Sequence, residues 1–281
     1  VGIWSRMDWL HGILNLARLL LWIIWRAGTM PRPKPRNSFT GPTPSPGPIS
    51  KHSWIYLATL VALLGLRAVF YHQFGPGLDW IPSLNLLNES PHFRSDLFPR
   101  ILAYSVVSFA RWLVAGYCCL ALLTAVLPQT ESSSSWKEFL KAQLGWLGSW
   151  PPAIHWLAII GLAIGVHLGE AEWMKAVGVW DETTDRLRQI PALVALDLRA
   201  TLYLIMTLLA LYLLNSYVYF GEQPFLKTVN ESGKRLLKPL RILPLEMGKI
   251  DLAPFIAFIL AFGLSFALRR EHLANWLRAT N

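Results

Sequence analysis

The stretch LAPFIAFILAFGLSFAL, residues 252–268, decides the class of fold. It carries no charged side chain across 17 residues, and ten of its residues are Leu, Ile or Phe. Each such residue favours membrane insertion by about 0.3 to 0.6 kcal/mol, so the segment gains roughly 3 to 6 kcal/mol in a bilayer. The stretch therefore predicts a helix that spans a membrane.

Four further apolar segments precede it along the chain, at residues 54–71, 101–127, 154–168 and 200–220. The 281-residue chain is 53% hydrophobic and 15% charged, whereas about a quarter of the residues in a soluble domain are charged. Segment 154–168 is shorter than the roughly 20 residues that usually cross a bilayer, which leaves open a short span or a re-entrant segment. We expect an all-α integral membrane protein with about five transmembrane helices.

Residues 1–28 contain an apolar run with four polar interruptions, at Asp8, His11, Asn15 and Arg18. Spacings of three and four residues place these side chains on one helical face. The pattern predicts an N-terminal amphipathic helix lying in the membrane interface, and the polar stripe argues against a cleaved signal peptide, the alternative. Residues 29–51 are rich in Pro and Arg and poor in apolar side chains, which predicts a flexible tether.

The net charge of +9 comes from Lys and Arg residues that flank the apolar segments. Because these residues form no basic face studded with aromatic side chains, we expect anionic membrane lipids as partners and no nucleic acid. If all five segments span, the two sides carry thirteen and eight basic residues. The positive-inside rule then places the N-terminus in the cytoplasm and the C-terminus outside. An acidic cluster is expected in an outer loop, comprising Glu170, Glu172, Asp181, Glu182 and Asp185.

The chain contains a weak internal repeat. Residues 120–123 (LALL) resemble residues 209–212 (LALY), and residues 139–141 match residues 225–227 (FLK). Both pairs occur in the order of long apolar segment, short amphipathic stretch and second apolar segment, which predicts two related helical hairpins that run parallel in the membrane. After the tether, we expect a first transmembrane helix with its outer loop at residues 52–96, a first unit at 97–170 and a second unit with the C-terminal tail at 171–281.

The segment between the last two apolar runs is the most distinctive in the chain. Its markers are Pro224-Phe225, the run LLKPLR at 236–241, Leu243-Pro244, GKID at 248–251 and Pro254. In these residues the chain resembles the YggT family of small integral membrane proteins, also called YlmG. The resemblance covers residues 97–268 as two units and is strong in 200–268, while the first unit lacks the Pro-Leu-Arg and Asp-x-x-Pro patterns and looks degenerate.

The resemblance implies a role without enzymatic activity. Relatives act in membrane-complex biogenesis, including haem attachment to a cytochrome in chloroplasts, or in envelope and osmotic physiology in bacteria. It also implies a bacterial inner-membrane location. The residues themselves agree, since we find no nucleophile with a base, no Gly-rich phosphate loop and no metal-ligand cluster.

Residues 224–254 also supply a candidate surface for binding a partner protein or lipid. Its members are Lys227, Lys234, Arg235, Lys238, Pro239, Arg241, Pro244, Asp251 and Pro254. The prolines are expected to end an interfacial helix and to begin the last span, and Asp251 is expected to complement the dipole of that span. A rigid connection with no docking role is the alternative.

Charged residues within the apolar segments are a second candidate site, because an unpaired charge inside a membrane is costly and often marks function. We expect Arg67, Arg111, Asp197 and Arg199 to form an intramembrane polar clasp, with Asp197 paired to Arg111 or Arg67. A polar entrance to a solute pathway is the alternative.

His155 and His167 lie 12 residues apart in segment 154–168, about 18 Å along a helix. We interpret them as interfacial polar residues, with axial ligation of a haem or other tetrapyrrole pigment as the alternative. The sequence therefore predicts a non-catalytic accessory or assembly subunit that associates with other integral membrane subunits. A component of a small-solute channel or transporter, an osmotic-response protein and a tetrapyrrole-binding subunit are the alternatives.

Overall fold

The computed structural model describes residues 3–29, 53–78, 82, 84, 92–127, 134–145, 150–179, 189–218, 223–242, 245–247 and 250–279. Within these ranges the chain is helical apart from short turns and a two-residue β-ladder. The predicted tether lies outside them except for Thr29, as does most of the acidic cluster expected in the outer loop.

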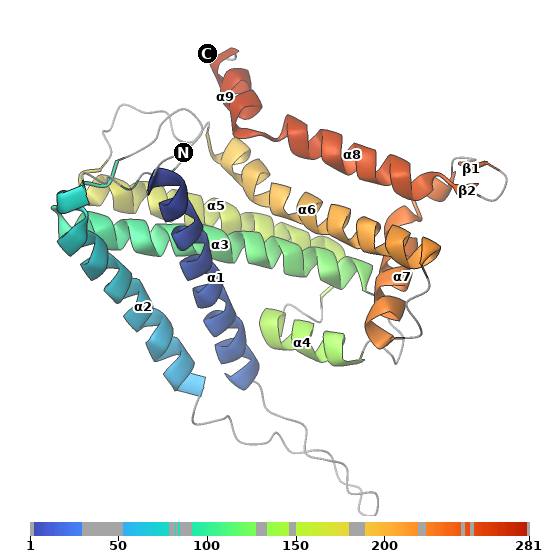
Figure 1. Cartoon of the computed structure of the whole chain (residues 1–281), viewed down its shortest axis with the longest axis horizontal. Helices are drawn as coiled ribbons and strands as arrows, with labels where there is room; N and C mark the ends of the chain where they lie inside the picture. The colour runs from blue at the N-terminus through green and yellow to red at the C-terminus, as the bar shows by residue number, and fades with distance from the viewer. Residues whose placement is uncertain are drawn as a thin grey trace, which may run out of the picture.

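The α-helices are α1 (Ile3–Thr29), α2 (Ser53–Phe74), α3 (Phe98–Val126), α4 (Ser134–Leu144), α5 (Pro152–Ala176), α6 (Ile190–Tyr217), α7 (Pro224–Leu237), α8 (Ala253–Ala267) and α9 (Arg270–Ala279). Short helices follow the long helices α3 and α6 along the chain (Figure 1). The short elements are the 3-10 helices η1 (Pro76–Leu78) and η4 (Leu240–Ile242), and the antiparallel strands β1 (Glu246–Met247) and β2 (Ile250–Asp251).

Among the described residues, four helices are long and apolar enough to cross a membrane, namely α2, α3, α5 and α6. The pair α8 and α9, bent by 55°, gives a fifth if it acts as one span. The prediction of an all-helical integral membrane protein with about five spans is confirmed. The short segment 154–168 is part of a 25-residue helix, whereas the segment 252–268 forms a 15-residue helix that ends at the bend.

The two predicted hairpins are present as α3–α4–α5 and α6–α7–α8, which we call the first and second repeats. In each, the second long helix packs back along the first, α5 on α3 and α8 on α6. Both short helices lie near the same end of the long ones, and α3 and α6 pack together at the centre (Figure 1). The expected boundary between units at residue 170 falls inside α5, which continues to Ala176.

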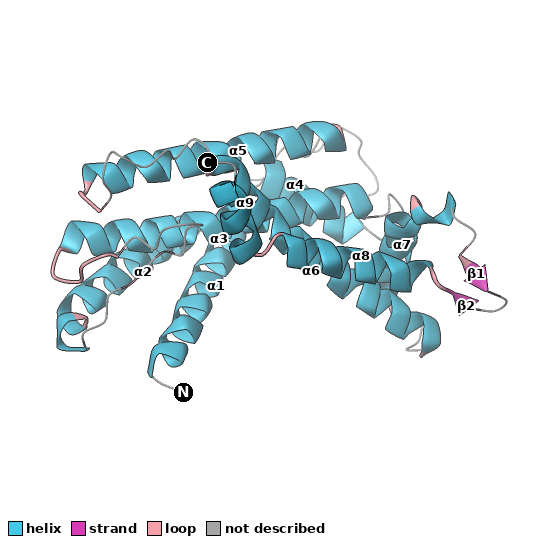
Figure 2. Ribbon diagram, turned by 90° about the horizontal axis from the view of Figure 1, so that it is seen from above, coloured by secondary structure: helices cyan, strands magenta, loops and turns pink. Residues whose placement is uncertain are grey.

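Helix α1 packs lengthwise beside α2 and also contacts α3, with α3 between α1 and α5 (Figure 2). Its polar stripe faces inward: Asn15 is 2% exposed and Arg18 is fully buried. Its exposed face is apolar and includes Ile13 and Leu20. This is the reverse of the predicted interfacial arrangement, in which the polar face meets water. The stripe was correctly placed on one helical face, but neighbouring helices supply its polar partners.

Candidate sites within and beside the membrane helices

The first site is a chain of four ionisable side chains that crosses α3, α5 and α6. The guanidinium of Arg111 donates two hydrogen bonds to Glu170, with Nε 3.1 Å from Oε2. One turn earlier on α5, Nδ1 of His167 lies 3.3 Å from the same oxygen of Glu170. The other ring nitrogen of His167 lies 2.8 Å from Oδ2 of Asp197 on α6. We call these four residues the ion cluster.

Burial makes the pairing in the ion cluster energetically important. Glu170 is 5% exposed and His167 is 4% exposed. When the imidazole of His167 is protonated, the cluster holds two cations and two anions. Removal of one partner from such a set leaves a buried charge without compensation, which typically costs 3–5 kcal/mol. The ion cluster therefore stabilises one register of the three spanning helices α3, α5 and α6.

The expected direct pairing of Asp197 with Arg111 or Arg67 does not form. Arg111 and Asp197 belong to the same cluster, but Glu170 and His167 stand between them. Glu170 was assigned to the outer loop, whereas it lies inside α5, because that helix extends well past the apolar segment 154–168. The signal that could have found it was the i, i+3 spacing of His167 and Glu170 on a continuing helix.

The second site joins α1, α2 and α3 around the side chain of Asn15. Its Oδ1 accepts hydrogen bonds from Arg67 at 2.9 Å and from Arg18 at 3.1 Å. Its Nδ2 donates to Oγ of Ser108 at 2.9 Å. Arg18 also donates to the backbone oxygen of Leu63 at 3.0 Å. One amide side chain thus orients two buried guanidiniums, which we call the arginine cluster.

Aromatic rings surround Arg67 in the arginine cluster. Its Cζ lies 5.4 Å from the ring centre of Tyr71 and 4.9 Å from that of Tyr104. The hydroxyl of Tyr71 lies 2.6 Å from Nδ1 of His11. Among the side chains that the structure describes, no carboxylate bonds to Arg18 or Arg67. The ring faces therefore provide part of the compensation that a carboxylate gives in the ion cluster. Sequence reasoning placed His11 on the polar stripe but did not single out either tyrosine.

Two other arginines connect helices without joining either cluster. Nε of Arg199 on α6 lies 3.3 Å from Oγ of Ser265 on α8, so this predicted member of the clasp links the two long helices of the second repeat. Arg100, at the start of α3, donates to the backbone oxygens of Val177 at 3.1 Å and Gly178 at 2.6 Å. A cation at the C-terminal end of α5 complements the dipole of that helix.

The predicted basic surface lies on α7 and η4. The side chains of Lys227, Lys234, Lys238 and Arg241 are exposed and form what we call the α7 basic surface. The opposite face of α7 is buried through Val229 and Leu237. Arg235 is also exposed, but its NH1 donates a hydrogen bond to the backbone oxygen of Leu127 at the end of α3, at 2.8 Å.

Close packing holds α7 in place beneath that surface. A Cβ atom added to Gly233 would lie 2.6 Å from the ring of Tyr212 on α6, so glycine permits the two helices to touch. Helix α7 also contacts α3 and α8. The second short helix is thus fixed against both repeats.

The connection into α8 has the local geometry that its residues predict. Oδ1 of Asp251 accepts a hydrogen bond from the backbone N–H of Ala253 at 2.9 Å, at the N-terminal end of α8. Pro254 is buried in the first turn, where its missing N–H costs nothing. Pro239 is exposed after α7, and Pro244 lies outside the described residues.

The histidine geometry bears on the tetrapyrrole alternative. Both ring nitrogens of His167 face carboxylates, so ligation of an iron would require it to give up one of these contacts. His155 is 3% exposed, with Nδ1 3.4 Å from Oγ1 of Thr124. Within the described residues, no group of three His, Cys, Asp or Glu side chains is placed to hold a metal ion.

Comparisons with protein-family models, with curated proteins and with solved structures find no match for this chain.

Proposed function

We propose that this chain is a non-catalytic integral membrane protein that helps to assemble, stabilise or anchor a larger membrane complex. The observation that carries the proposal is the α7 basic surface, four exposed cations along α7 and η4, with the other face of α7 buried against both repeats. A rigidly held patch of charge offers a partner a fixed pattern of donors. Anionic lipids and acidic segments of other membrane subunits are the partners that this chemistry fits.

The charges inside the bundle also support this proposal. The side chains of the ion cluster bond to one another across α3, α5 and α6. In the arginine cluster the guanidiniums bond to Asn15 and to backbone. Charged groups that bond in this way stabilise the contacts between helices. We therefore expect partner molecules to bind at the surface of the protein. The resemblance of residues 224–254 to the YggT family is consistent with this role, and we propose that the two repeats are YggT-like units.

We further propose that the α7 basic surface lies on the cytoplasmic side of a bacterial inner membrane. The thirteen basic residues on the side of residues 26–51 and the short helices, against eight on the other side, support this orientation through the positive-inside rule. The antiparallel contact of α1 with α2 affects the side of the membrane on which the N-terminus lies. If α1 crosses the bilayer beside α2, its first residues lie on the side opposite the α7 basic surface.

The direct test is purification of the tagged full chain from native membranes in mild detergent, with mass spectrometry of what accompanies it and an absorption spectrum of the same sample. The test variant is Lys234→Gln with Lys238→Gln. The matched control is Arg94→Gln with Lys175→Gln, which also removes two exposed cations. Arg94 takes part in an exposed pair with Asp96 and lowers the pKa of that carboxyl by hydrogen bonding.

We expect one defined set of membrane proteins in stoichiometric amount with the wild type and the control, and less of it with the α7 variant. Each exposed cation near an anionic surface contributes about 1 kcal/mol, so the loss should be roughly tenfold or more. Recovery of the chain alone, or only as a homo-oligomer, would contradict the proposal. A tetrapyrrole absorption band would favour a cofactor-binding subunit instead.

A solute channel or transporter component is the second candidate, and the ion cluster favours it. A histidine between two carboxylates inside spanning helices is the arrangement used by many proton relays. The protein would be reconstituted into liposomes with a pH-sensitive dye inside, as wild type and as Asp197→Asn. Proton entry that requires Asp197 would support transport, and equal traces from protein-containing and empty liposomes would exclude it.

A further inference from the structure

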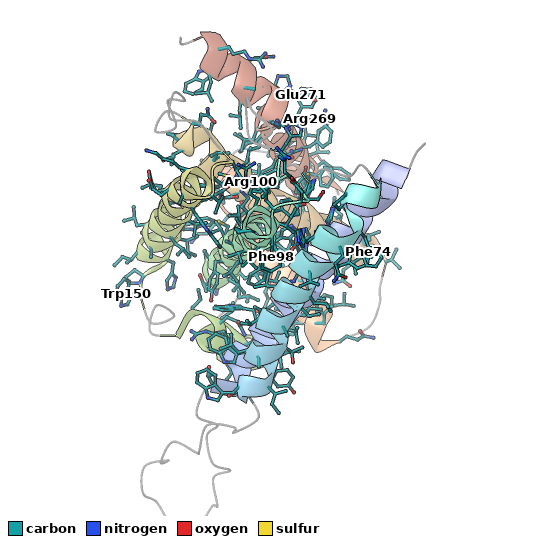
Figure 3. All side chains as sticks on the ribbon, turned by 90° about the vertical axis from the view of Figure 1, so that its left-hand side faces the viewer. Phe74, Phe98, Arg100, Trp150, Arg269 and Glu271 are labelled. Carbon is teal, nitrogen blue, oxygen red and sulfur yellow. The ribbon has the colours of Figure 1, made fainter. Side chains whose placement is uncertain are left out.

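A cavity of about 760 Å³ lies where α8 meets α9. Its polar lining comes from α6, from the junction and from α9, and consists of Arg199, Arg269, Arg270, Glu271, Asn275 and Arg278. Among the described residues that line it, four are cationic and one is anionic. Figure 3 shows Arg269 and Glu271 near each other at the base of α9. The cavity is thus strongly positive and within the size range of small-ligand pockets.

The surrounding residues place this cavity at the level of lipid headgroups. The outer face of α8 exposes large apolar side chains, including Ile259 and Phe262, which suit contact with acyl chains. The apolar helix ends at Ala267, and Arg269 follows in the bend. On α9, Trp276 is 58% exposed. Arginine and tryptophan at the end of an apolar helix are typical of the membrane interface.

Contacts within the cavity hold two of the arginines without neutralising them. Nε of Arg199 faces the hydroxyl of Ser265, and its Cζ lies 5.2 Å from the ring centre of Tyr203. Cζ of Arg269 lies 4.4 Å from the ring centre of Phe266. A hydroxyl and two aromatic rings orient the guanidiniums but carry no net charge. Planar, oriented guanidiniums are well suited to paired hydrogen bonds with a phosphate group.

The geometry points to a binding site for the phosphate of an acidic phospholipid, which we call the α8–α9 lipid site. A lipid is favoured over free phosphate because the positive cavity adjoins the apolar outer face of α8, so one molecule can place its phosphate among the arginines and its acyl chains along that helix. The site is separate from the α7 basic surface and does not depend on the function proposed above.

Native mass spectrometry of the delipidated full chain in detergent tests this site. The probes are phosphatidylglycerol and phosphatidylcholine, each titrated against wild type and against Arg269→Gln with Arg278→Gln. The control is Arg94→Gln with Lys175→Gln. We expect the wild type and the control to retain phosphatidylglycerol in preference to phosphatidylcholine. We expect the affinity of the double variant for phosphatidylglycerol to fall by about tenfold or more, because hydrogen bonds to a charged group are lost.

A second variant separates loss of the site from loss of folding. Glu271→Gln removes the one anion in the described lining, so it should bind phosphatidylglycerol more tightly than wild type, and a misfolded chain would not give that gain. Inorganic phosphate is the competitor that distinguishes the two sources of phosphate. If inorganic phosphate displaces phosphatidylglycerol at equimolar concentration, the ligand of the site is a soluble anion and the lipid proposal is wrong. Equal binding of the two lipids, or no effect of the two-arginine variant, would overturn the proposal.

Discussion

In the first repeat, α5 is joined to α3 by the pair of Arg111 with Glu170 in addition to apolar packing, whereas in the second repeat α8 is joined to α6 by apolar side chains centred on Leu209 and by the hydrogen bond of Arg199 to Ser265. The helix layouts match, and the chemistry inside them does not. A long helix, a short amphipathic helix and a return helix can therefore pack together with or without a buried ion pair between the first and the last of them. The ion cluster of the first repeat is completed by Asp197 on α6, which belongs to the second repeat.

The short helices differ in the same way. In the first repeat α4 buries Leu140 and Leu144 and has a modest basic content. In the second repeat α7 buries Val229 and Leu237 and exposes the α7 basic surface. The first repeat was expected to be degenerate because it lacks the loop motif, yet it supplies three of the four residues of the ion cluster. The ion pair between two long helices lies in the first repeat, and the exposed basic surface lies in the second.

Among the changes proposed here, breaking the ion cluster should lower the free energy of unfolding the most. Glu170→Leu leaves the partly buried Arg111 without its carboxylate, so we expect the free energy of unfolding to fall by about 3–5 kcal/mol. The measurement is unfolding of the purified protein in mixed detergent micelles, followed by circular dichroism. Arg111→Leu with Glu170→Leu should recover most of that loss, because no charge is left without a partner. If the double variant is as unstable as the single one, the pair is not what joins α3 to α5.

Crowding the contact between α6 and α7 tests how the second repeat is held together. In Gly233→Ala the new Cβ would lie 2.6 Å from the ring of Tyr212, so α7 must shift, and overpacking of this kind costs about 1–3 kcal/mol. The control is Gly161→Ala on α5, where a Cβ meets nothing within 4 Å. There the better helix propensity of alanine should leave stability unchanged or raised. Similar melting shifts for both variants in the same assay would contradict close packing as the cause.

Removing the cap of α8 should give the smallest of these effects. Asp251→Ala deletes the hydrogen bond to the N–H of Ala253, and loss of such a cap costs about 0.5–2 kcal/mol. The first repeat has Pro151 and Pro152 at the equivalent start of α5 and no acidic cap. Hydrogen exchange should therefore become faster in the first turn of α8 and stay unchanged in the first turn of α5. Asp251→Asn should retain most of the protection, because its amide oxygen can still accept the bond.

Local pattern was sufficient for the long helices and for the repeat. The run at 200–220 identified α6, although the structure extends that helix back to Ile190 across Asp197 and Arg199. The apolar pattern places the acidic end of α5, with Glu170, in a loop, because it treats charge as the end of a span. Buried pairing allows a helix to continue through charged residues, and hydropathy alone does not detect such pairing.

The sequence by itself determined the membrane class of the protein, the places of its main helices, the common polar face of His11, Asn15 and Arg18, and the basic face of α7. These properties depend on apolar content and on the 3.6-residue period, which are local to a segment. Only the tertiary structure decided that Glu170 pairs with Arg111, that Asn15 orients two arginines, and that four arginines surround one cavity. Such partnerships depend on the depth and rotation of each helix against its neighbours, which no single segment encodes.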